Sequence, residues 1–420
     1  MSVARMCDRL AAPPNVRAAA ERAAAKTQNV RYEPQRTVAV EVLNAFFEQG
    51  IADSDLTGTL GYGYDDAARA TYEALLARIF GTERALARLS IVSGTHAIVA
   101  TLAACASSGD GILAVTGRPY DTLRNSICDD SQSLVARGRH YREVELCADG
   151  TIDADSIVRA LEERNYAVAF VQRSRGYAPR RSVSVDECAR AVEAVKRVSP
   201  ATLVLVDNCY GELVEEREPT HVGADAVMGS LIKNLGGSIA PGGGYIAGSA
   251  AIIERVATRI YVPGLGDSLG PTLGFGRAFV HGLFLAPGIV EQCLRGLDFA
   301  AALFEELGYS VDPKPGERRT DIVQAIRLGS PDLLMRFAAG LQAAMPLNAR
   351  FRPEPGPVPG YRDPVVMSGG AFVAGATIEL SCDAPLRPPY DVYLQGGTSA
   401  DHVRFGALSA ATFLAEKTGL

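Results

Sequence analysis

Between about residue 90 and residue 250, short apolar segments alternate with longer segments of helical periodicity. Runs of apolar residues predict strands at 112–115, 168–172, 203–207, 226–229 and 245–247. Helices are predicted at 95–107, 121–136, 153–163 and 184–198, the last beginning with a capping box, Ser184-Val-Asp-Glu187. This alternation predicts an α/β fold, with a mainly parallel sheet that has helices on both faces.

Helical and mixed segments flank this region. A helix is expected over 13–50, followed by a glycine- and tyrosine-rich loop at 58–66 and a second helix that ends at Gly81. Further on, the sequence predicts a long helix at 287–307, strands at 321–327 and 375–381, a helix at 331–344 and a proline-rich loop at 352–360. We therefore expect an N-terminal helical segment (1–60), a large domain (61–290) and a small C-terminal α+β domain (291–420).

Charge and hydropathy argue against several classes of partner. The net charge of −6 and the pI of about 5.6 do not suit nucleic acid or an anionic membrane surface. The most membrane-like stretch, 269–288, is interrupted by Pro271, Arg277 and His281, and no apolar signal sequence opens the chain. The eight cysteines form no C-x-x-C pair, so we expect reduced thiols in a cytoplasmic protein.

A lone lysine, Lys233, stands in a stretch of apolar and small residues, 228–248, that includes seven glycines. One interpretation is a surface lysine at the mouth of a glycine-rich turn. The other is a lysine that forms a Schiff base. An apolar site lowers the pKa of an amine, which can then condense with an aldehyde such as that of pyridoxal phosphate.

An acid, Asp207, follows the apolar run 203–206 and is expected at the carboxyl end of a buried strand. Open α/β sheets bind their ligands at that end. Alone, such an acid is often a cap or turn residue. Together with Lys233 it could keep a pyridine nitrogen protonated, which makes the ring a better electron acceptor.

Small residues open the helix predicted at 95–107. The backbone N–H groups of Gly94 and Thr95 could bind a phosphate, and Ser230 could add a hydroxyl to the same group. Tyr120, just past a strand, could stack on a flat ring or could simply fill space. His96 is interpreted as a structural residue.

Other chemistries have little support in the sequence. The histidines and acids show no metal-ligand spacing such as H-E-x-x-H, so no metal site is expected, and no G-x-S-x-G motif is present. A dinucleotide-binding fold is a weak alternative, because no G-x-G-x-x-G follows the first strand.

Taken as a set, the motifs resemble the pyridoxal-phosphate enzymes of fold type I, in the cystathionine/methionine γ-lyase superfamily. The resemblance covers roughly residues 30–410 and is greatest to the aluminium-resistance, or methionine γ-lyase-like, branch. The motifs are Gly61-Tyr-Gly-Tyr-Asp-Asp66, Ile91-Val-Ser-Gly-Thr-His-Ala97, Gly117-Arg-Pro-Tyr-Asp-Thr122, Gln172-Arg-Ser-Arg-Gly-Tyr177, Val206-Asp-Asn-Cys-Tyr-Gly-Glu212, Gly229-Ser-Leu-Ile-Lys-Asn234, Arg319-Thr-Asp-Ile, Pro364-Val-Val-Met, Pro385-Leu-Arg-Pro-Pro-Tyr390 and Tyr393-Leu-Gln-Gly-Gly397.

The resemblance implies an aminotransferase-like fold type I, pyridoxal 5'-phosphate as cofactor and a homodimer or homotetramer. It implies roles for particular residues: Lys233 binds the cofactor covalently, Asp207 contacts the pyridine nitrogen, Tyr120 stacks on the ring, and Gly94, Thr95 and Ser230 hold the phosphate. Lys233 and Tyr120 are the expected catalytic residues. Tyr62 or Tyr64 would complete the phosphate site of a neighbouring subunit, to which the segment 1–60 contributes. Arg404 or Arg387 would bind the substrate carboxylate.

The chain departs from the usual pattern of this branch beside the cofactor motifs. Leu235 and Gly242 replace a proline and a threonine, and Arg88-Leu89-Ser90 replaces Arg-Pro-Gln. The expected reaction is γ-elimination on a γ-substituted L-α-amino acid. The leaving group is a thiolate, or a halide in a specialised biosynthetic step that gives an unsaturated amino acid such as propargylglycine.

The same residues could also carry out β-elimination, γ-replacement or racemisation, because these reactions share a carbanion at Cα. A non-enzymatic role in metal tolerance is the alternative of a different class. The presence of both Lys233 and Asp207 argues against it.

Overall fold

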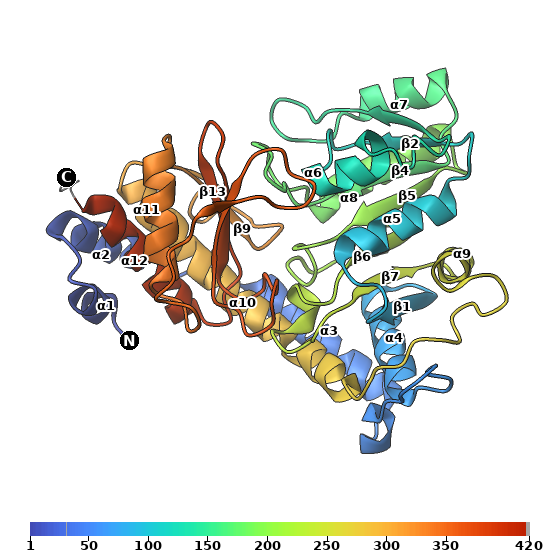
Figure 1. The fold of residues 1–420 in the computed structure, drawn as a ribbon, viewed down its shortest axis with the longest axis horizontal. Coiled ribbons are helices and arrows are strands. Elements are labelled where there is room, and N and C mark those ends of the chain that lie inside the picture. The colour runs from blue at the N-terminus through green and yellow to red at the C-terminus, as the bar shows by residue number, and fades with distance from the viewer. Residues whose placement is uncertain (31, 417–420) are drawn as a thin grey trace. The chain divides into compact units, whose positions relative to one another are not determined.

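The computed structural model describes residues 1–30 and 32–416. It divides into a large unit, Arg36–Pro287, and a small unit that joins Met1–Gln35 to Gly288–Leu420. The sequence analysis placed the corresponding boundaries at 60/61 and 290/291. Figure 1 shows the two units with their elements labelled.

The large unit is built on a seven-stranded sheet in the part of the chain that the structure describes, with strand order β1-β7-β6-β5-β4-β2-β3. Strands β3, β2, β4, β5 and β6 are parallel, and β7 pairs antiparallel with both β6 and β1. The strands are β1 (Arg84–Arg88), β2 (Gly111–Ala114), β3 (His140–Glu143), β4 (Val168–Gln172), β5 (Leu203–Asp207), β6 (Ala226–Ser230) and β7 (Gly244–Gly248).

The helices that lie wholly or mostly in the large unit are α3 (Glu33–Gln49), α4 (Ala67–Phe80), α5 (Gly94–Cys105), α6 (Asp121–Arg124), α7 (Ala154–Glu163), α8 (Val185–Val198) and α9 (Ala250–Tyr261), with short turns η1 (Asp53–Leu56), η2 (Asn125–Asp129), η3 (Pro219–Val222) and η4 (Asn234–Gly236). Apolar residues of α5 and α9 form one buried cluster with Val168 and Phe170 of β4. The alternate residues Ala169 and Val171 are also buried, so both faces of the sheet are covered.

The small unit contains a six-stranded antiparallel sheet within its described residues, in the order β10-β11-β12-β13-β9-β8. Its helices α11 and α12 pack against each other. Its elements are α1 (Val3–Arg9), α2 (Pro14–Thr27), β8 (Ser310–Asp312), β9 (Val323–Arg327), α11 (Pro331–Gln342), β10 (Pro355–Gly356), β11 (Val365–Gly369), β12 (Ser381–Pro385), β13 (Asp391–Gln395) and α12 (Ala400–Ala415). Helix α10 (Gly276–Glu306) contains the boundary between the two units.

The sequence predicted most of the parallel sheet correctly. Strands β4 and β5 have the expected bounds, and β2, β6 and β7 differ by one or two residues. Strands β1 and β3 were missed because both are short and rich in charged residues. Ser184 caps α8 as expected by accepting a hydrogen bond from Glu187 N, but the Glu187 carboxylate bonds to Ile152 N.

Four helix or strand predictions were wrong. The helix expected at 121–136 ends at a turn in which the Asp130 side chain accepts a hydrogen bond from Gln132 N. The helix expected over 13–50 is two helices, α2 and α3. The helix expected at 287–307 is α10, which begins earlier, at Gly276, and has Pro287 inside it.

The strand expected at 375–381 is a loop. Its Glu379 carboxylate accepts hydrogen bonds from Phe372 N and Val373 N, and strand β12 begins only at Ser381. Elsewhere in the small unit, β8, β10, β11, β13 and helix α12 were not predicted. No helix among the described residues is long and apolar enough to cross a membrane.

Candidate active site

The carboxyl ends of three neighbouring parallel strands bring polar side chains to one edge of the large unit's sheet. Gln172 ends β4 and lies opposite Asp207, which ends β5. Asp207 in turn lies opposite Met228 of β6, and that strand ends two residues later at Ser230. The order of the strands therefore gathers residues that are far apart in the sequence, as it does in other open α/β sheets.

The N-terminus of α5 lies directly against this edge. A Cβ atom on Gly94 would be 3.0 Å from Cys209 Sγ and 3.3 Å from Ser230 Cβ, so a larger residue would crowd these neighbours. Ser93 caps the helix by accepting a hydrogen bond from His96 N. Free backbone N–H groups and the Ser230 hydroxyl thus face the same space, an arrangement that favours an anion such as phosphate.

The phenol of Tyr120 joins the helix N-terminus to the strand ends. Its hydroxyl forms a 2.7 Å hydrogen bond with Thr95 Oγ1, and its backbone N donates to Gln172 Oε1 at 3.1 Å. Burial, and then the nearby charge of Asp207, raise the pKa of Tyr120 well above its ordinary value. Tyr120 is therefore a neutral, fixed aromatic ring beside Asp207.

Asp207 is a buried carboxylate, and few protein groups stabilise its negative charge. Its Oδ1 accepts a hydrogen bond from Cys209 N at 3.1 Å. Burial raises the pKa of Asp207, although the positive charge of Lys233 opposes this rise. A cationic group bound beside Asp207 would stabilise its ionised form.

Lys233 is partly buried, and its Nζ lies 3.8 Å from the centre of the Tyr210 ring. Within residues 1–30 and 32–416, no carboxylate lies within ion-pair distance of this amine, whereas Lys26 and Lys196 pair with Glu305 and Asp225. Lys233 is therefore not held in an ion pair, as an amine that condenses with an aldehyde requires.

The charge state of Lys233 differs from the expectation for an apolar pocket. Burial lowers the pKa of the amine, but neighbouring acidic groups, Cys209, Tyr210 and Asp207 among them, outweigh burial and raise the pKa well above its ordinary value. The sequence analysis expected a lowered pKa because it considered only the apolar residues around the lysine.

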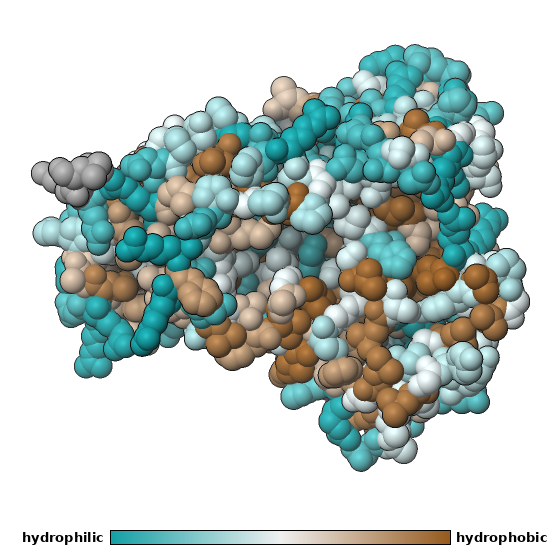
Figure 2. Space-filling view, in the orientation of Figure 1, coloured by the Kyte–Doolittle hydropathy of each residue, from teal (hydrophilic) through white to brown (hydrophobic). Residues whose placement is uncertain are grey.

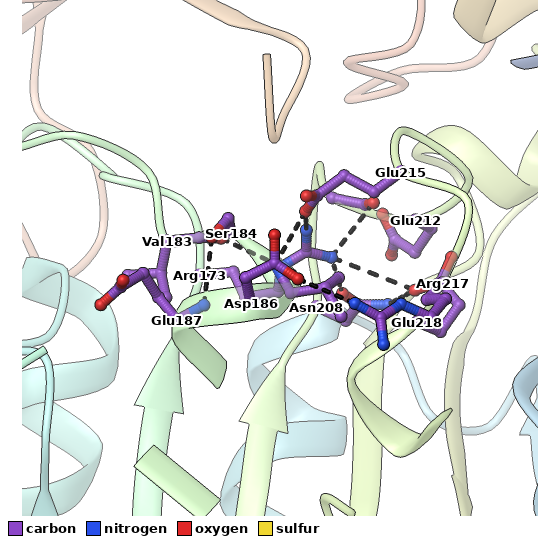
Figure 3. A network of polar contacts seen from close by, with 12 residues as sticks. Arg173, Val183, Ser184, Asp186, Glu187, Asn208, Glu212, Glu215, Arg217 and Glu218 are labelled. Carbon is purple, nitrogen blue, oxygen red and sulfur yellow. Dashed lines mark hydrogen bonds and ion pairs between the residues drawn. The ribbon is translucent and has the colours of Figure 1, made fainter. Parts of the chain in front are cut away.

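Sequence analysis gave no role to the buried network behind the site, shown in Figure 3. The fully buried Arg173 follows Gln172 and donates to Glu215 Oε2 at 2.6 Å and to Asn208 Oδ1 at 2.5 Å. Glu218 accepts from Asn208 Nδ2 and from Leu213 N, both at 2.8 Å. This network fixes the loop that follows Asp207, and paired buried charges of this kind are costly to break.

A second buried acid, Glu212, lies at the end of the same loop. Its Oε1 accepts a hydrogen bond from Tyr245 OH at 3.0 Å, and burial raises its pKa to about 8, so this carboxyl is neutral at pH 7. The side-chain amide of Asn234, which follows Lys233, donates to the carbonyl oxygens of Tyr210 and Glu212. Asn234 therefore connects the lysine segment to the loop after Asp207.

The glycine–tyrosine loop is firmly anchored, although its tyrosines are exposed. Tyr62 is 74% exposed and Tyr64 is 54% exposed. The Asp66 carboxylate holds the loop by accepting hydrogen bonds from Thr59 N and Thr272 N, both at 2.8 Å, and from their hydroxyl groups. Although burial opposes the shift, these hydrogen bonds hold the pKa of Asp66 below its ordinary value.

The two candidate carboxylate-binding arginines belong to the small unit. Arg387 donates to Asp363 Oδ2 at 3.2 Å. Arg404 lies on α12, donates to Asp401 Oδ1 at 3.1 Å and has its guanidinium carbon 5.9 Å from the centre of the Phe299 ring. Both assignments stay predictions.

The large unit's residues fit the cofactor that the sequence resemblance implies. A phosphorylated pyridine aldehyde needs an anion site, an aromatic neighbour, a carboxylate for its ring nitrogen and an amine with no other bond. Gly94 with Ser230, Tyr120, Asp207 and Lys233 meet these needs in that order, and a Cβ at position 94 would crowd Ser230, which belongs to the same anion site.

Comparison with known proteins finds a matching family model and similar relatives. The family model described as methionine gamma-lyase matches residues 14–414. The chain is 41% identical to the uncharacterized protein YnbB of Bacillus subtilis over 380 residues, which cover 90% of each protein.

Solved structures are also similar. The carbon-sulfur lyase involved in aluminum resistance from Clostridium novyi NT matches with a TM-score of 0.92 and 38% identity, over 97% of this chain and 98% of that one. The pyridoxal-5'-phosphate dependent protein YhfS of Escherichia coli matches with a TM-score of 0.61 and 18% identity, over 90% and 96% of the two chains. The latter likeness shows the fold alone. It confirms the expected α/β fold of type I.

Proposed function

The chain belongs to the methionine gamma-lyase family, and we propose that it is a pyridoxal phosphate-dependent lyase that eliminates a γ substituent from an L-α-amino acid. One observation carries the proposal. Lys233 has no ion-pair partner among the described residues, and it shares the ends of the parallel strands with Asp207 and the Gly94–Ser230 anion site.

Each residue at this edge has a part in the proposed reaction. Backbone N–H groups at the start of α5, with Ser230, would bind the phosphate, and the ring of Tyr120 would pack against the cofactor ring. Asp207 keeps a proton on the pyridine nitrogen, because a buried carboxylate favours a bound cation. When bound, the cofactor supplies an acceptor for the electrons of a carbanion.

Lys233 moves the protons. Once substrate has displaced its amine, Lys233 removes the Cα proton as a general base. A γ substituent leaves only when negative charge develops at Cβ, so a second proton must be removed there. Lys233 is the residue that we assign to both transfers, so it must give up the first proton before it removes the second.

The leaving group is proposed as a thiolate or a halide. The Clostridium novyi relative is described as a carbon-sulfur lyase, which supports a thiolate as the leaving group. Leu235 and Gly242, which replace residues usual in this branch, lie in the segment after Lys233 and support a changed substrate. A halide leaving group would give an unsaturated amino acid such as propargylglycine.

The proposed chemistry predicts proton exchange at two carbons. Norvaline has no leaving group, so in heavy water the loaded enzyme should incorporate deuterium at Cα and, more slowly, at Cβ. Nuclear magnetic resonance of the recovered amino acid measures both exchanges, and the protein without cofactor is the control. Exchange only at Cα would contradict γ-elimination and favour a β-lyase or a racemase.

We also propose that the active enzyme is a homo-oligomer, a dimer or a tetramer, in which Tyr62 or Tyr64 completes a neighbour's phosphate site. The anchored loop presents both rings outward, and their centres lie 6.0 Å apart. Figure 2 shows apolar side chains gathered on the same face of the large unit, around α4 and the loops beside it. Exposed apolar residues of these loops are Leu60, Leu265, Leu273 and Phe275.

Mixing two inactive variants tests this shared site. Lys233→Ala and the double variant Tyr62→Ala/Tyr64→Ala each lack one half of the site. Random mixing in a twofold dimer should restore about a quarter of the wild-type activity, because half of the dimers are mixed and carry one intact site. Light scattering checks assembly. Failure of the mixture to regain activity, with dimers present, would remove the tyrosines from the neighbour's site.

A further inference from the structure

Tyr210 has an unusual backbone conformation for a residue with a large side chain. Its φ angle is 70°, in the left-handed region. Glycine adopts this conformation without strain, whereas other residues do so at a conformational cost. Strain of this kind concentrates at functional sites, where the surrounding structure holds the residue in place. The ring of Tyr210 is therefore expected to have a function.

The ring of Tyr210 is a close neighbour of the Lys233 amine. The Nζ atom lies 3.8 Å from the ring centre, whereas the other three cation–ring pairs of the described residues are 4.7, 5.5 and 5.9 Å apart. The electron-rich face of an aromatic ring attracts an ammonium ion, and the attraction is stronger away from water. The contact thus favours the charged form of the amine.

Two restraints hold the ring against the lysine. On one side, Asn234 follows Lys233 and its Nδ2 donates to Tyr210 O at 3.1 Å. On the other side, Arg173 Nη1 donates to Gly211 O at 3.2 Å, and a Cβ on Gly211 would lie 2.4 Å from the same nitrogen. The buried network of Figure 3 fixes Arg173 in turn through Glu215.

We infer that Tyr210 is a positioning residue whose ring holds Lys233 Nζ beside the substrate carbons once the amine is released from the cofactor, and stabilises the ammonium ion that forms when this amine has taken up a proton. The inference rests on the proposed role of Lys233 and adds a residue to it. A proton taken from Cα is then held on Lys233 until its next transfer. Burial lowers the pKa of Lys233, but the neighbouring acidic groups raise it by more. These groups therefore also favour the ammonium form of the amine.

Two substitutions separate the ring from the backbone. Tyr210→Gly removes the ring and also relieves the left-handed backbone, so this variant should fold. Tyr210→Phe keeps the ring face and removes only the hydroxyl. Tyr309→Leu, at a ring of the small unit that packs on Phe304, is a matched control for the loss of a tyrosine.

The pH dependence of the lysine provides the measurement. In the loaded enzyme, the midpoint of the pH-dependent change in the visible absorption band should fall by about 1 pH unit in Tyr210→Gly. Tyr210→Phe and the control should stay within about 0.3 pH units of wild type, as a retained ring face predicts. An unchanged midpoint in Tyr210→Gly would overturn the inference.

A second titration uses the full-length apoprotein and needs no cofactor. Trace labelling with isotopic acetic anhydride across a pH series, followed by peptide mapping, reports the pKa of the Lys233 amine. Tyr210→Gly should again lower it by about 1 unit. A wild-type protein that fails to take up pyridoxal phosphate would overturn the proposed function while this titration still decides the role of Tyr210.

Discussion

Replacing Lys233 by alanine will abolish the absorption band of covalently bound cofactor and reduce turnover by at least about 10³-fold, the scale of a lost general base. The reason is that no other described lysine lies at the strand ends. Lys26 and Lys196 are engaged with Glu305 and Asp225, and Lys314 belongs to the small unit. Absorption spectra and steady-state rates with a γ-substituted amino acid measure both effects.

Lys196→Ala is the matched control, since it removes an amine from the same unit and should leave both the band and the rate unchanged. Borohydride reduction of the wild-type protein, followed by peptide mapping, locates the attached cofactor. The adduct should fall on the peptide that contains Lys233. An adduct on another lysine would show that the site has been assigned wrongly.

The parallel sheet could be predicted because its strands are continuous apolar runs, buried on both faces. Leu203–Asp207 and Val168–Gln172 are of this kind. The antiparallel sheet of the small unit could not be predicted in the same way. Its strands include Ser381-Cys-Asp-Ala-Pro385, in which polar residues interrupt the apolar pattern and pairing with neighbouring strands decides the structure.

The candidate site was predictable to the extent that its residues lie at strand ends or helix starts. Asp207, Ser230 and Gly94 lie at such positions. Tyr210 was missed because its importance depends on a left-handed backbone and on a contact with Lys233 across 23 residues, neither of which leaves a periodic pattern. The glycine that follows an aromatic residue in Tyr210-Gly211 was the one local signal.

The raised pKa of Lys233 also could not be predicted from the sequence around it. Apolar neighbours in the sequence predicted a lowered value, but the charge of the amine depends on groups that the fold brings in from the loop after β5. Asp207 and Tyr210 precede Lys233 by more than twenty residues. Composition around a lysine therefore predicts its burial better than its charge.

Asp207 is a carboxylate that the apoprotein holds at a cost in stability. Burial raises its folded pKa above the unfolded value, so the stability that it contributes is present below the unfolded pKa and is lost as the pH rises towards the folded pKa. The hydrogen bond that its Oδ1 accepts from Cys209 N and the charge of Lys233 offset part of this cost. A residue kept under these conditions is expected to act on a ligand and not to support the fold.

Asp207→Asn should therefore separate stability from activity. The neutral amide removes the buried charge, so the apoprotein should unfold at the same temperature as wild type or at a higher one at pH 8. With cofactor bound, loss of the charged partner of the pyridine nitrogen should slow turnover by roughly 10²- to 10⁴-fold, as expected for breaking a buried pair worth about 3–5 kcal/mol. Calorimetry of the apoprotein and single-turnover kinetics of the loaded enzyme measure the two effects. Near wild-type turnover would remove Asp207 from the mechanism, whereas a less stable apoprotein would show that its carboxylate mainly supports the loop after β5.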